Sequence, residues 1–257
     1  MKTFSQFAAV FEAELKSYLR EVGPLVFVAV FPLFFSTLTY GMGTVLTGEA
    51  APERWLYQVI GFGVMTVSIV LTSSTAWYFR RGMSSGRLEY VMAAPVNPLV
   101  ILTAHSLANV LTSLLAFVFT GLVATYIVYG LSKIPGFLLA AAVTFFALLP
   151  VVGVNLVVGV ATIVAKEPEP VANTVAAVVA ATSGFAYPIT LLPPVLQLIG
   201  MILPFHHVVE TARAAVMTNL SPTQLPILLL MMLYLVAGLT VYRYGENHYA
   251  RKMGVSW

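Results

Sequence analysis

Long uncharged apolar runs alternate with short polar segments along most of the chain. Each run is long enough for a helix across a bilayer, which needs about 20 apolar residues. Charges and prolines delimit six such runs. The predicted spans are 22–48, 55–79, from Pro98 to about 129, 135–165 with a bend at Pro150, 171 to about 187, and 226–242.

In the outer segment 188–213, residues 188–203 are apolar but rich in proline, with Pro193 and Pro194 adjacent. A helix from Pro194 to Leu203 rises only about 15 Å, which is too short to span a bilayer. Counting it as a seventh span would also weaken the charge asymmetry between the two sides. We therefore expect a re-entrant hairpin that enters the outer leaflet and returns.

The basic residues fix the expected orientation. With an internal amino terminus, ten lie inside and three outside, which satisfies the positive-inside rule. Both termini are then cytoplasmic. The inner set is Lys2, Lys16, Arg20, Arg80, Arg81, Arg87, Lys166, Arg243, Arg251 and Lys252, and the outer set is Arg54, Lys133 and Arg213.

Residues 1–21 have a different pattern, because apolar side chains recur every three or four positions. They are Phe4, Phe7, Phe11, Leu15 and Tyr18, and charged residues occupy the remaining helical face. This pattern is typical of an amphipathic helix on the membrane surface. It favours equally a simple membrane anchor and a helix that also contacts a partner.

The composition agrees with a membrane protein. Of the 257 residues, 59% are hydrophobic and 9% are charged, and the mean hydropathy is +0.91. A soluble domain is about 25% charged, so a water-exposed surface is excluded. No repeat or long linker divides the chain. The predicted fold is one all-α polytopic membrane domain over residues 1–257.

The sequence lacks the residues that several kinds of site require. The chain has no cysteine and no aspartate, which excludes disulfides, thiolate metal sites and aspartate pairs. It also lacks the P-loop pattern G-x-x-x-x-G-K-[ST], so any ATP would bind to another chain. The positive charge follows membrane topology, so we expect no nucleic-acid partner. We predict no catalytic residue and no metal ligand.

The histidine pair His206–His207 lies three or four residues before Glu210, with Arg213 beyond. Adjacent helical residues point about 100° apart, so at most one histidine shares a face with Glu210. The pattern favours an interfacial helix that hydrogen-bonds to its neighbours over a metal site.

Polar and aromatic residues inside two predicted spans are candidates for a substrate path. In the third span, His105 and Asn109 lie near one helical face with several hydroxyl residues. Such residues form hydrogen bonds between helices more often than they line a path. In the first span, the candidates are Phe31, Phe35, Thr39 and Tyr40, and the alternative is that they face lipid.

Four small residues in the fifth span recur every four positions and allow another helix to approach closely. They are Ala172, Ala176, Ala180 and Gly184. The pattern fits packing inside one subunit and packing between two subunits equally well.

The segment 80–98 between the second and third spans is cytoplasmic in this orientation. It can form a short helix that ends at Pro95 and carries Arg87 and Glu89. Such a helix could transmit movement from a soluble partner into two spans, and the alternative is a solvated turn.

At this loop the sequence resembles the permease subunits of type 2 ATP-binding-cassette exporters. Those proteins carry Gly-Thr-Leu-Glu, followed by an apolar pair and a Pro-Val-Ser-like turn. The corresponding residues here are Gly86-Arg87-Leu88-Glu89 and Ala94-Pro95-Val96-Asn97, with Arg87 in place of Thr and Asn97 in place of Ser. The segment from Leu192 to Arg213 is similar to the same family's proline-rich hairpin, and the likeness covers nearly the whole chain.

The resemblance implies a permease dimer, made of two copies or of two different chains, in a prokaryotic plasma (inner) membrane. Two ATPase subunits, which would hold ATP and Mg, would drive export. It implies coupling to the ATPase through Arg87, Leu88, Glu89 and Tyr90, with a smaller contact at Lys166 and Glu167. It implies no particular substrate. The alternatives are a stand-alone secondary transporter and, third, an intramembrane enzyme or assembly scaffold.

Overall fold

The computed structural model describes residues 2–86, 97–165, 167–217, 224–246 and 248. All regular elements in these ranges are helical, with no strand. The α-helices are α1 (Lys2–Arg20), α2 (Val22–Thr47), α3 (Pro52–Ser84), α5 (Pro98–Tyr129), α6 (Ile134–Ala147), α7 (Leu149–Ala165), α8 (Pro168–Thr182), α9 (Pro194–Ile202), α10 (Pro204–Met217), α11 (Gln224–Met231) and α12 (Leu233–Gly245). Two short 3₁₀ helices, η1 (Gly130–Lys133) and η2 (Ile189–Leu191), complete the set.

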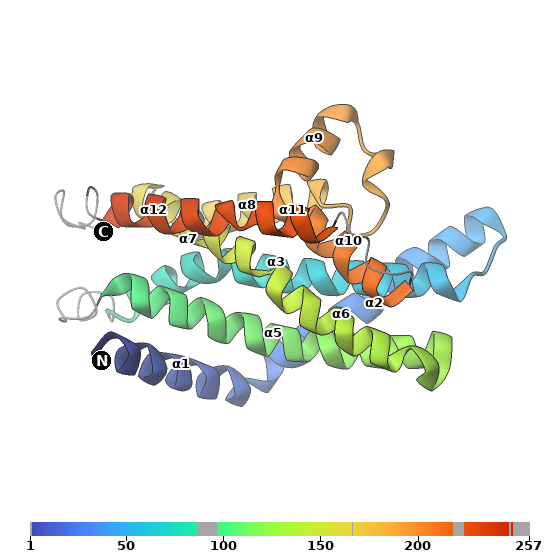
Figure 1. Cartoon of the computed structure of the whole chain (residues 1–257), viewed down its shortest axis with the longest axis horizontal. Coiled ribbons are helices and arrows are strands. Elements are labelled where there is room, and N and C mark those ends of the chain that lie inside the picture. Colours follow the sequence, from blue (N-terminus) through green and yellow to red (C-terminus); the bar gives the residue numbers. More distant parts are fainter. Residues whose placement is uncertain (1, 87–96, 166, 218–223, 247, 249–257) are drawn as a thin grey trace.

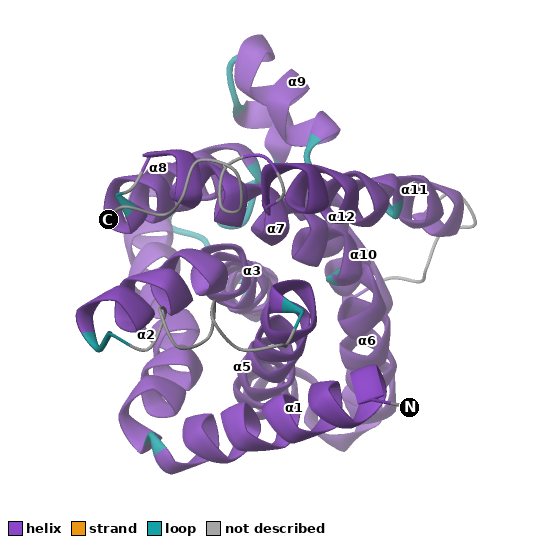
Figure 2. Cartoon of the chain, turned by 90° about the vertical axis from the view of Figure 1, so that its left-hand side faces the viewer, coloured by secondary structure: helices purple, strands orange, loops and turns teal. Residues whose placement is uncertain are grey.

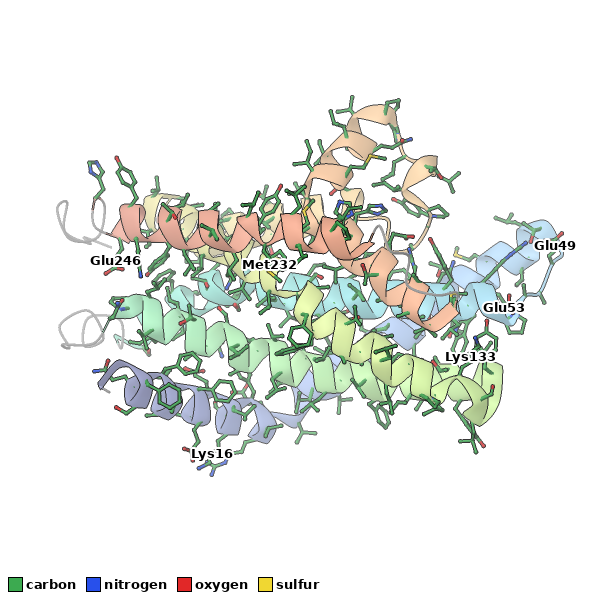
Figure 3. The ribbon with its side chains drawn as sticks, viewed as in Figure 1. Lys16, Glu49, Glu53, Lys133, Met232 and Glu246 are labelled. Carbon is green, nitrogen blue, oxygen red and sulfur yellow. The ribbon has the colours of Figure 1, made fainter. Side chains whose placement is uncertain are left out.

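The long helices form a bundle with two distinct ends (Figure 1). At one end α3 ends, α5 begins, α7 ends, α8 begins and α12 ends. We call it the loop end, and we call the opposite end, where α2 joins α3 and α5 joins α6, the far end. Figure 3 shows Glu49, Glu53 and Lys133 at the far end and Glu246 at the loop end. Charged side chains therefore flank a long apolar middle section, as a bilayer requires.

Helix α3 is the centre of the bundle and packs against α2, α5, α7, α8 and α10 (Figure 2). Its core side chains interlock with aromatic residues of the surrounding helices. The largest fully buried members of this core include Leu56, Ile60, Leu71, Phe117, Phe137, Leu148, Phe185 and Phe205. By contrast, α2 exposes much of its apolar surface, including Phe27, Phe34 and Met42. Such an exposed apolar face is suited to lipid or to another membrane helix.

Local sequence explains several helix ends. Asn97 caps α5, because its side chain accepts a hydrogen bond from the Leu99 amide at 3.0 Å, and Pro98 follows as the first helical residue. The break between α6 and α7 falls at Leu148. It lies two residues before Pro150, which has no amide hydrogen to continue the helix. A bend near this proline was expected.

Within the described part of the chain, three helical stretches are long and apolar enough to cross a membrane: Leu25–Thr47, Pro52–Gly82 and Pro98–Ala165. The third has 68 residues, and the chain reverses direction within it at η1 (Figure 1). It therefore contains the predicted third and fourth spans. Helices α9 and α10 meet at 81° and form a fourth candidate only if the bent pair counts as one span. The count of six spans stays a prediction.

The predicted fifth span is shorter than expected. Helix α8 has 15 residues, which rise about 22 Å, less than the roughly 30 Å of a bilayer core. It ends at Thr182 because Ser183 and Gly184 turn the chain, and Gly184 has a positive φ of 68°. This left-handed conformation suits glycine at a helix end.

Candidate functional site

The loop end carries two adjacent arginines in the last turns of α3. Arg80 forms an ion pair with Glu169 in the first turn of α8, and both side chains are about half exposed. The Arg80 guanidinium also lies over the Trp77 ring, 5.7 Å from its centroid. The ion pair joins the helix before the 87–96 segment to the helix after residue 166. It therefore links the two helices that adjoin the segments in which coupling residues were predicted.

The predicted coupling residues themselves fall mostly outside the described residues. This applies to Arg87, Leu88, Glu89, Tyr90 and Lys166. Glu167 is described, is exposed and precedes α8 without capping it through its side chain. Its carboxylate is accessible at the loop end, next to the Arg80–Glu169 pair in the chain.

Helix α1 is attached to the bundle by a polar contact with α5. Glu14 Oε2 lies 3.1 Å from Nδ1 of His105, whose side chain is only 1% exposed. The Tyr18 hydroxyl lies 3.3 Å from Nε2 of the same ring, and the Asn109 amide lies 3.2 Å from it. One buried imidazole thus contacts two side chains of α1. The amphipathic helix does more than lie on a membrane, because its polar side chains reach the bundle.

Tyr18 also connects α1 to α3, since Arg81 donates a hydrogen bond of 3.5 Å to its hydroxyl. Burial raises the pKa of Tyr18 to about 12, against the opposing effect of the Arg81 charge. The phenol therefore stays protonated at physiological pH and remains a hydrogen-bond donor.

Two cavities lie on either side of this Tyr18–Arg81 contact. One has a volume of about 350 Å³ and is lined by Glu14, Tyr78 and His105 together with serines at the end of α3. The other, of about 410 Å³, lies along α3 between residues 69 and 81 and includes Asn109. His105 and Asn109, predicted as path residues, therefore line cavities, and His105 also contacts side chains of α1 and α3.

The predicted path residues of α2 lie elsewhere. The rings of Phe31 and Phe35 are 4.4 Å apart between centroids, and Phe35 packs on Phe62 of α3 at 6.1 Å. Thr39 donates a hydrogen bond of 2.8 Å to Gln58 of α3, and Tyr40 is partly buried. These residues form the α2–α3 contact in this chain.

The path candidates of α2 and those of α5 contact α3 at different positions along its length. Gln58, the partner of Thr39, lies 20 residues before Tyr78, whose ring is 4.9 Å from that of His105. Twenty helical residues rise about 30 Å. The structure therefore does not bring the two groups together into one site.

The small residues predicted to form one contact face in the fifth span differ in burial. Ala172 is buried against Ala76 and Val158, inside the subunit. Ala176 is partly buried, and Ala180 is exposed. The inclusion of Gly184 was wrong, because α8 ends at Thr182 and Gly184 lies in the following turn. The remaining face of small residues is therefore buried inside the subunit at Ala172 and exposed at Ala180.

The histidine pair takes part in local contacts of α10. His207 Nε2 lies 2.8 Å from the Met201 carbonyl oxygen, and the two histidine rings are 5.3 Å apart between centroids. Within the described ranges, no group of three or more histidine or carboxylate side chains is arranged to hold a metal ion.

Among the described residues, the charged residue with the most hydrogen bonds is Arg213, which sequence reasoning placed on the outside at the end of the proline-rich segment without predicting these bonds. It is 3% exposed, and its guanidinium lies 3.5 Å from the centroid of the Tyr57 ring. It donates hydrogen bonds to the Tyr57 hydroxyl at 2.8 Å, to the Gly184 carbonyl at 2.9 Å, and to the Phe185 carbonyl. A single arginine within an apolar run was the only available signal.

Asn155 of α7 was also missed. Its side-chain oxygen accepts a bond from the Thr75 amide of α3 at 3.1 Å, and its amide donates to Ser106 of α5 at 2.8 Å. One buried asparagine thus joins three helices. An isolated asparagine in an apolar run suggests such a role, although its partners could not be predicted from spacing.

These features define a membrane-embedded helical bundle with a polar loop end and cavities where α1, α3 and α5 meet. A family model described as the ABC-2 type transporter matches residues 5–217, which is most of the chain. The chain therefore belongs to the ABC-2 type transporter family and is a membrane permease component of a transporter. No curated protein matches the chain.

Proposed function

We propose that this chain is the transmembrane subunit of an ATP-binding-cassette exporter and forms the substrate path with a second permease, either a copy or a different chain. A separate ATPase subunit would bind ATP and Mg and drive the cycle. The observation that carries the proposal is the family match over residues 5–217. It runs from α1 to α10 and so includes the helices on both sides of the 87–96 segment.

We propose that the loop end faces the cytoplasm of a prokaryotic cell. Its described basic residues are Lys16, Arg20, Arg80, Arg81 and Arg243, whereas Arg54, Lys133 and Arg213 lie toward the far end. This asymmetry supports cytoplasmic termini in the inner membrane. Lys16 points away from the bundle (Figure 3) and pairs with Glu12 at 2.5 Å. Such an outer face on α1 supports its placement at the polar membrane surface.

Six spans remain the proposed topology. They correspond to α2, α3, α5, the pair α6–α7, α8 and the pair α11–α12. Because α8 is short, α9 and α10 would fill the rest of the fifth crossing as a re-entrant hairpin. The fully apolar exposed face of α9, with Val195, Leu198 and Ile202, favours this placement in lipid.

The proposal predicts a stoichiometric partner. Purification of the tagged chain from its native membrane in mild detergent should recover a soluble subunit with a Walker A sequence, identified and counted by mass spectrometry. The same data would distinguish one permease species from two. Recovery of the chain alone, while a reference transporter complex stays intact, would instead favour a stand-alone secondary transporter driven by an ion gradient.

The Arg80–Glu169 pair provides a test of coupling. Arg80→Glu and Glu169→Arg each place like charges together, and we expect each to lower the ATPase activity of the purified complex about fivefold, from a repulsion of about 1 kcal/mol. The double exchange should restore most of the activity, because it restores the pair in reverse.

Arg243→Glu is the matched control, since Arg243 is exposed at the same end and forms no ion pair with a described residue. It makes the same charge change as Arg80→Glu without placing a like charge against Glu169. If the double exchange is as impaired as the two single variants combined, the pair has no role in coupling.

A further inference from the structure

The larger of the two loop-end cavities is lined by both apolar and charged residues. It has a volume of about 410 Å³ and lies between the end of α1, the α1–α2 junction at Glu21, α3 and α5. Four of its α3 residues, Ile69, Ser73, Trp77 and Arg81, are spaced four apart and so follow one helical face. Twelve residues of helix rise about 18 Å. The cavity therefore changes along its length from an apolar end at Ile69 to a guanidinium at Arg81.

The cavity lining contains one group of each charge. Both Arg81 and Glu21 line the cavity and are exposed. Arg81 makes a long hydrogen bond of 3.5 Å to Tyr18 and no ion pair with a described residue. Glu21 precedes α2 without using its side chain to cap that helix. A guanidinium that retains free donors binds phosphate well, and a carboxylate in the same lining can bind an ammonium group.

An unsatisfied hydroxyl lies in the wall of the same cavity. Ser74 is 4% exposed, and its hydroxyl has no hydrogen-bond partner among the described residues. It lies between the apolar end and the charged end in sequence. A buried polar group without a partner is uncommon in folded proteins, and this hydroxyl is free to bond to a molecule in the cavity. An ester oxygen between a headgroup and an acyl chain would supply the missing bond.

We propose that this cavity binds a zwitterionic phospholipid from the leaflet at the loop end. The phosphate would lie against Arg81 and the amine against Glu21. One acyl chain would follow α3 past Trp77 to Ile69 and Val70, and an ester oxygen would accept a hydrogen bond from Ser74. The proposal concerns binding to this chain and does not depend on transport or on an ATPase.

The test is native mass spectrometry of the purified full chain in detergent, with dioleoylphosphatidylethanolamine titrated from low concentration. The wild type should retain one tightly bound lipid. Arg81→Gln should weaken its binding at least about tenfold, because it removes a charge-assisted hydrogen bond. Arg80→Gln is the matched control, since Arg80 pairs with Glu169 and does not line the cavity. It should retain the lipid within about twofold of the wild type.

Further variants test each part of the proposed site. Glu21→Gln should remove the preference for phosphatidylethanolamine over phosphatidylglycerol, because only the former has an amine. Ile69→Trp should fill the apolar end and weaken both lipids. Free phosphoethanolamine, which has the headgroup and no chain, should not compete for the site.

Three outcomes would overturn the proposal. Equal lipid retention by Arg81→Gln and Arg80→Gln would remove Arg81 from the site. Competition by free phosphoethanolamine at the lipid's own concentration would indicate a site for soluble phosphate compounds. Dimers that retain no lipid would indicate that a second copy of the chain covers the cavity.

Discussion

Replacing Gly153 or Gly238 by leucine is expected to separate α7 from α12 and to destabilise the protein strongly. A Cβ atom on Gly153 would overlap the Tyr234 carbonyl and lie 2.6 Å from the Leu235 Cα. One on Gly238 would overlap the Gly153 carbonyl and lie 2.5 Å from the Gly153 Cα. Backbone atoms cannot rotate away as a side chain can. Each substitution must therefore move one helix away from the other.

The two glycines belong to one longitudinal seam. Seven residues beyond Gly238, a Cβ on Gly245 would lie 2.6 Å from Val160, which is seven residues beyond Gly153. Helices that run in the same direction and meet every seven residues pack along their length. In lipid, where apolar surface is no longer driven together by water, such close contact is a main source of helix association.

The expected effect can be measured by thermal unfolding in detergent. Overpacking costs about 1–3 kcal/mol, which corresponds to a fall of roughly 2–12 °C in Tm for a chain of this size. Gly41→Leu and Gly43→Leu are the matched controls, because both lie in α2 and a Cβ there would meet nothing within 4 Å. They should leave Tm within about 2 °C of the wild type. Equal Tm values for the two sets would contradict the close packing of α7 and α12.

This seam also shows what the sequence could and could not predict. The long apolar runs predicted α2, α3, α5 and the α6–α7 pair, because helix length in a bilayer follows directly from uncharged length. Small residues were sought in α8, where four-residue spacing was regular, but the α7–α12 contact at Gly153 and Gly238, which leaves no room for a Cβ, was not anticipated. Spacing within one helix identifies a possible contact face, whereas the partner helix is set by tertiary packing.

At the candidate site too, the sequence predicted a contact face of one helix but did not predict its partner residues. The polar face of α5 was recognised, and His105 on it contacts Glu14 and Tyr18 of α1, while its role as a path residue stays a prediction. These partners on α1 were not predicted, because residues about 90 positions apart carry no common local pattern. Thr120 is a further example, since its hydroxyl donates a hydrogen bond of 2.6 Å to the Ala29 carbonyl of α2.

The predicted fifth span differed most from expectation, because backbone geometry overrides hydropathy there. The run 171–187 is uncharged throughout, yet α8 stops at Thr182, and Gly184 beyond it adopts a positive φ. The turn exposes two carbonyl groups, at Gly184 and Phe185, to the interior of the bundle. Both accept hydrogen bonds from Arg213. The irregular backbone is thus tolerated inside the bundle because a buried guanidinium donates hydrogen bonds to its carbonyl groups.

Arg213→Met is therefore expected to disrupt the turn after α8 and the packing of α10 on α3. Methionine fills similar space but donates no hydrogen bond, so the Gly184 and Phe185 carbonyls would be buried without partners. Each unsatisfied buried acceptor costs about 1–3 kcal/mol, which gives a total loss of roughly 2–6 kcal/mol. Arg213→Lys should be intermediate, because an ammonium group cannot reproduce the several directed bonds of a guanidinium.

The same unfolding measurement tests this prediction, with Arg54→Met as the control. Arg54 also lies toward the far end and pairs with Glu49 at 2.7 Å, but both side chains are more than half exposed. An exposed pair contributes about 0–1 kcal/mol, so its loss should change stability little. If Arg213→Met is as stable as Arg54→Met, then the two carbonyls have another source of hydrogen bonds. Arg213 would in that case have no part in holding α3, α10 and the turn after α8 together.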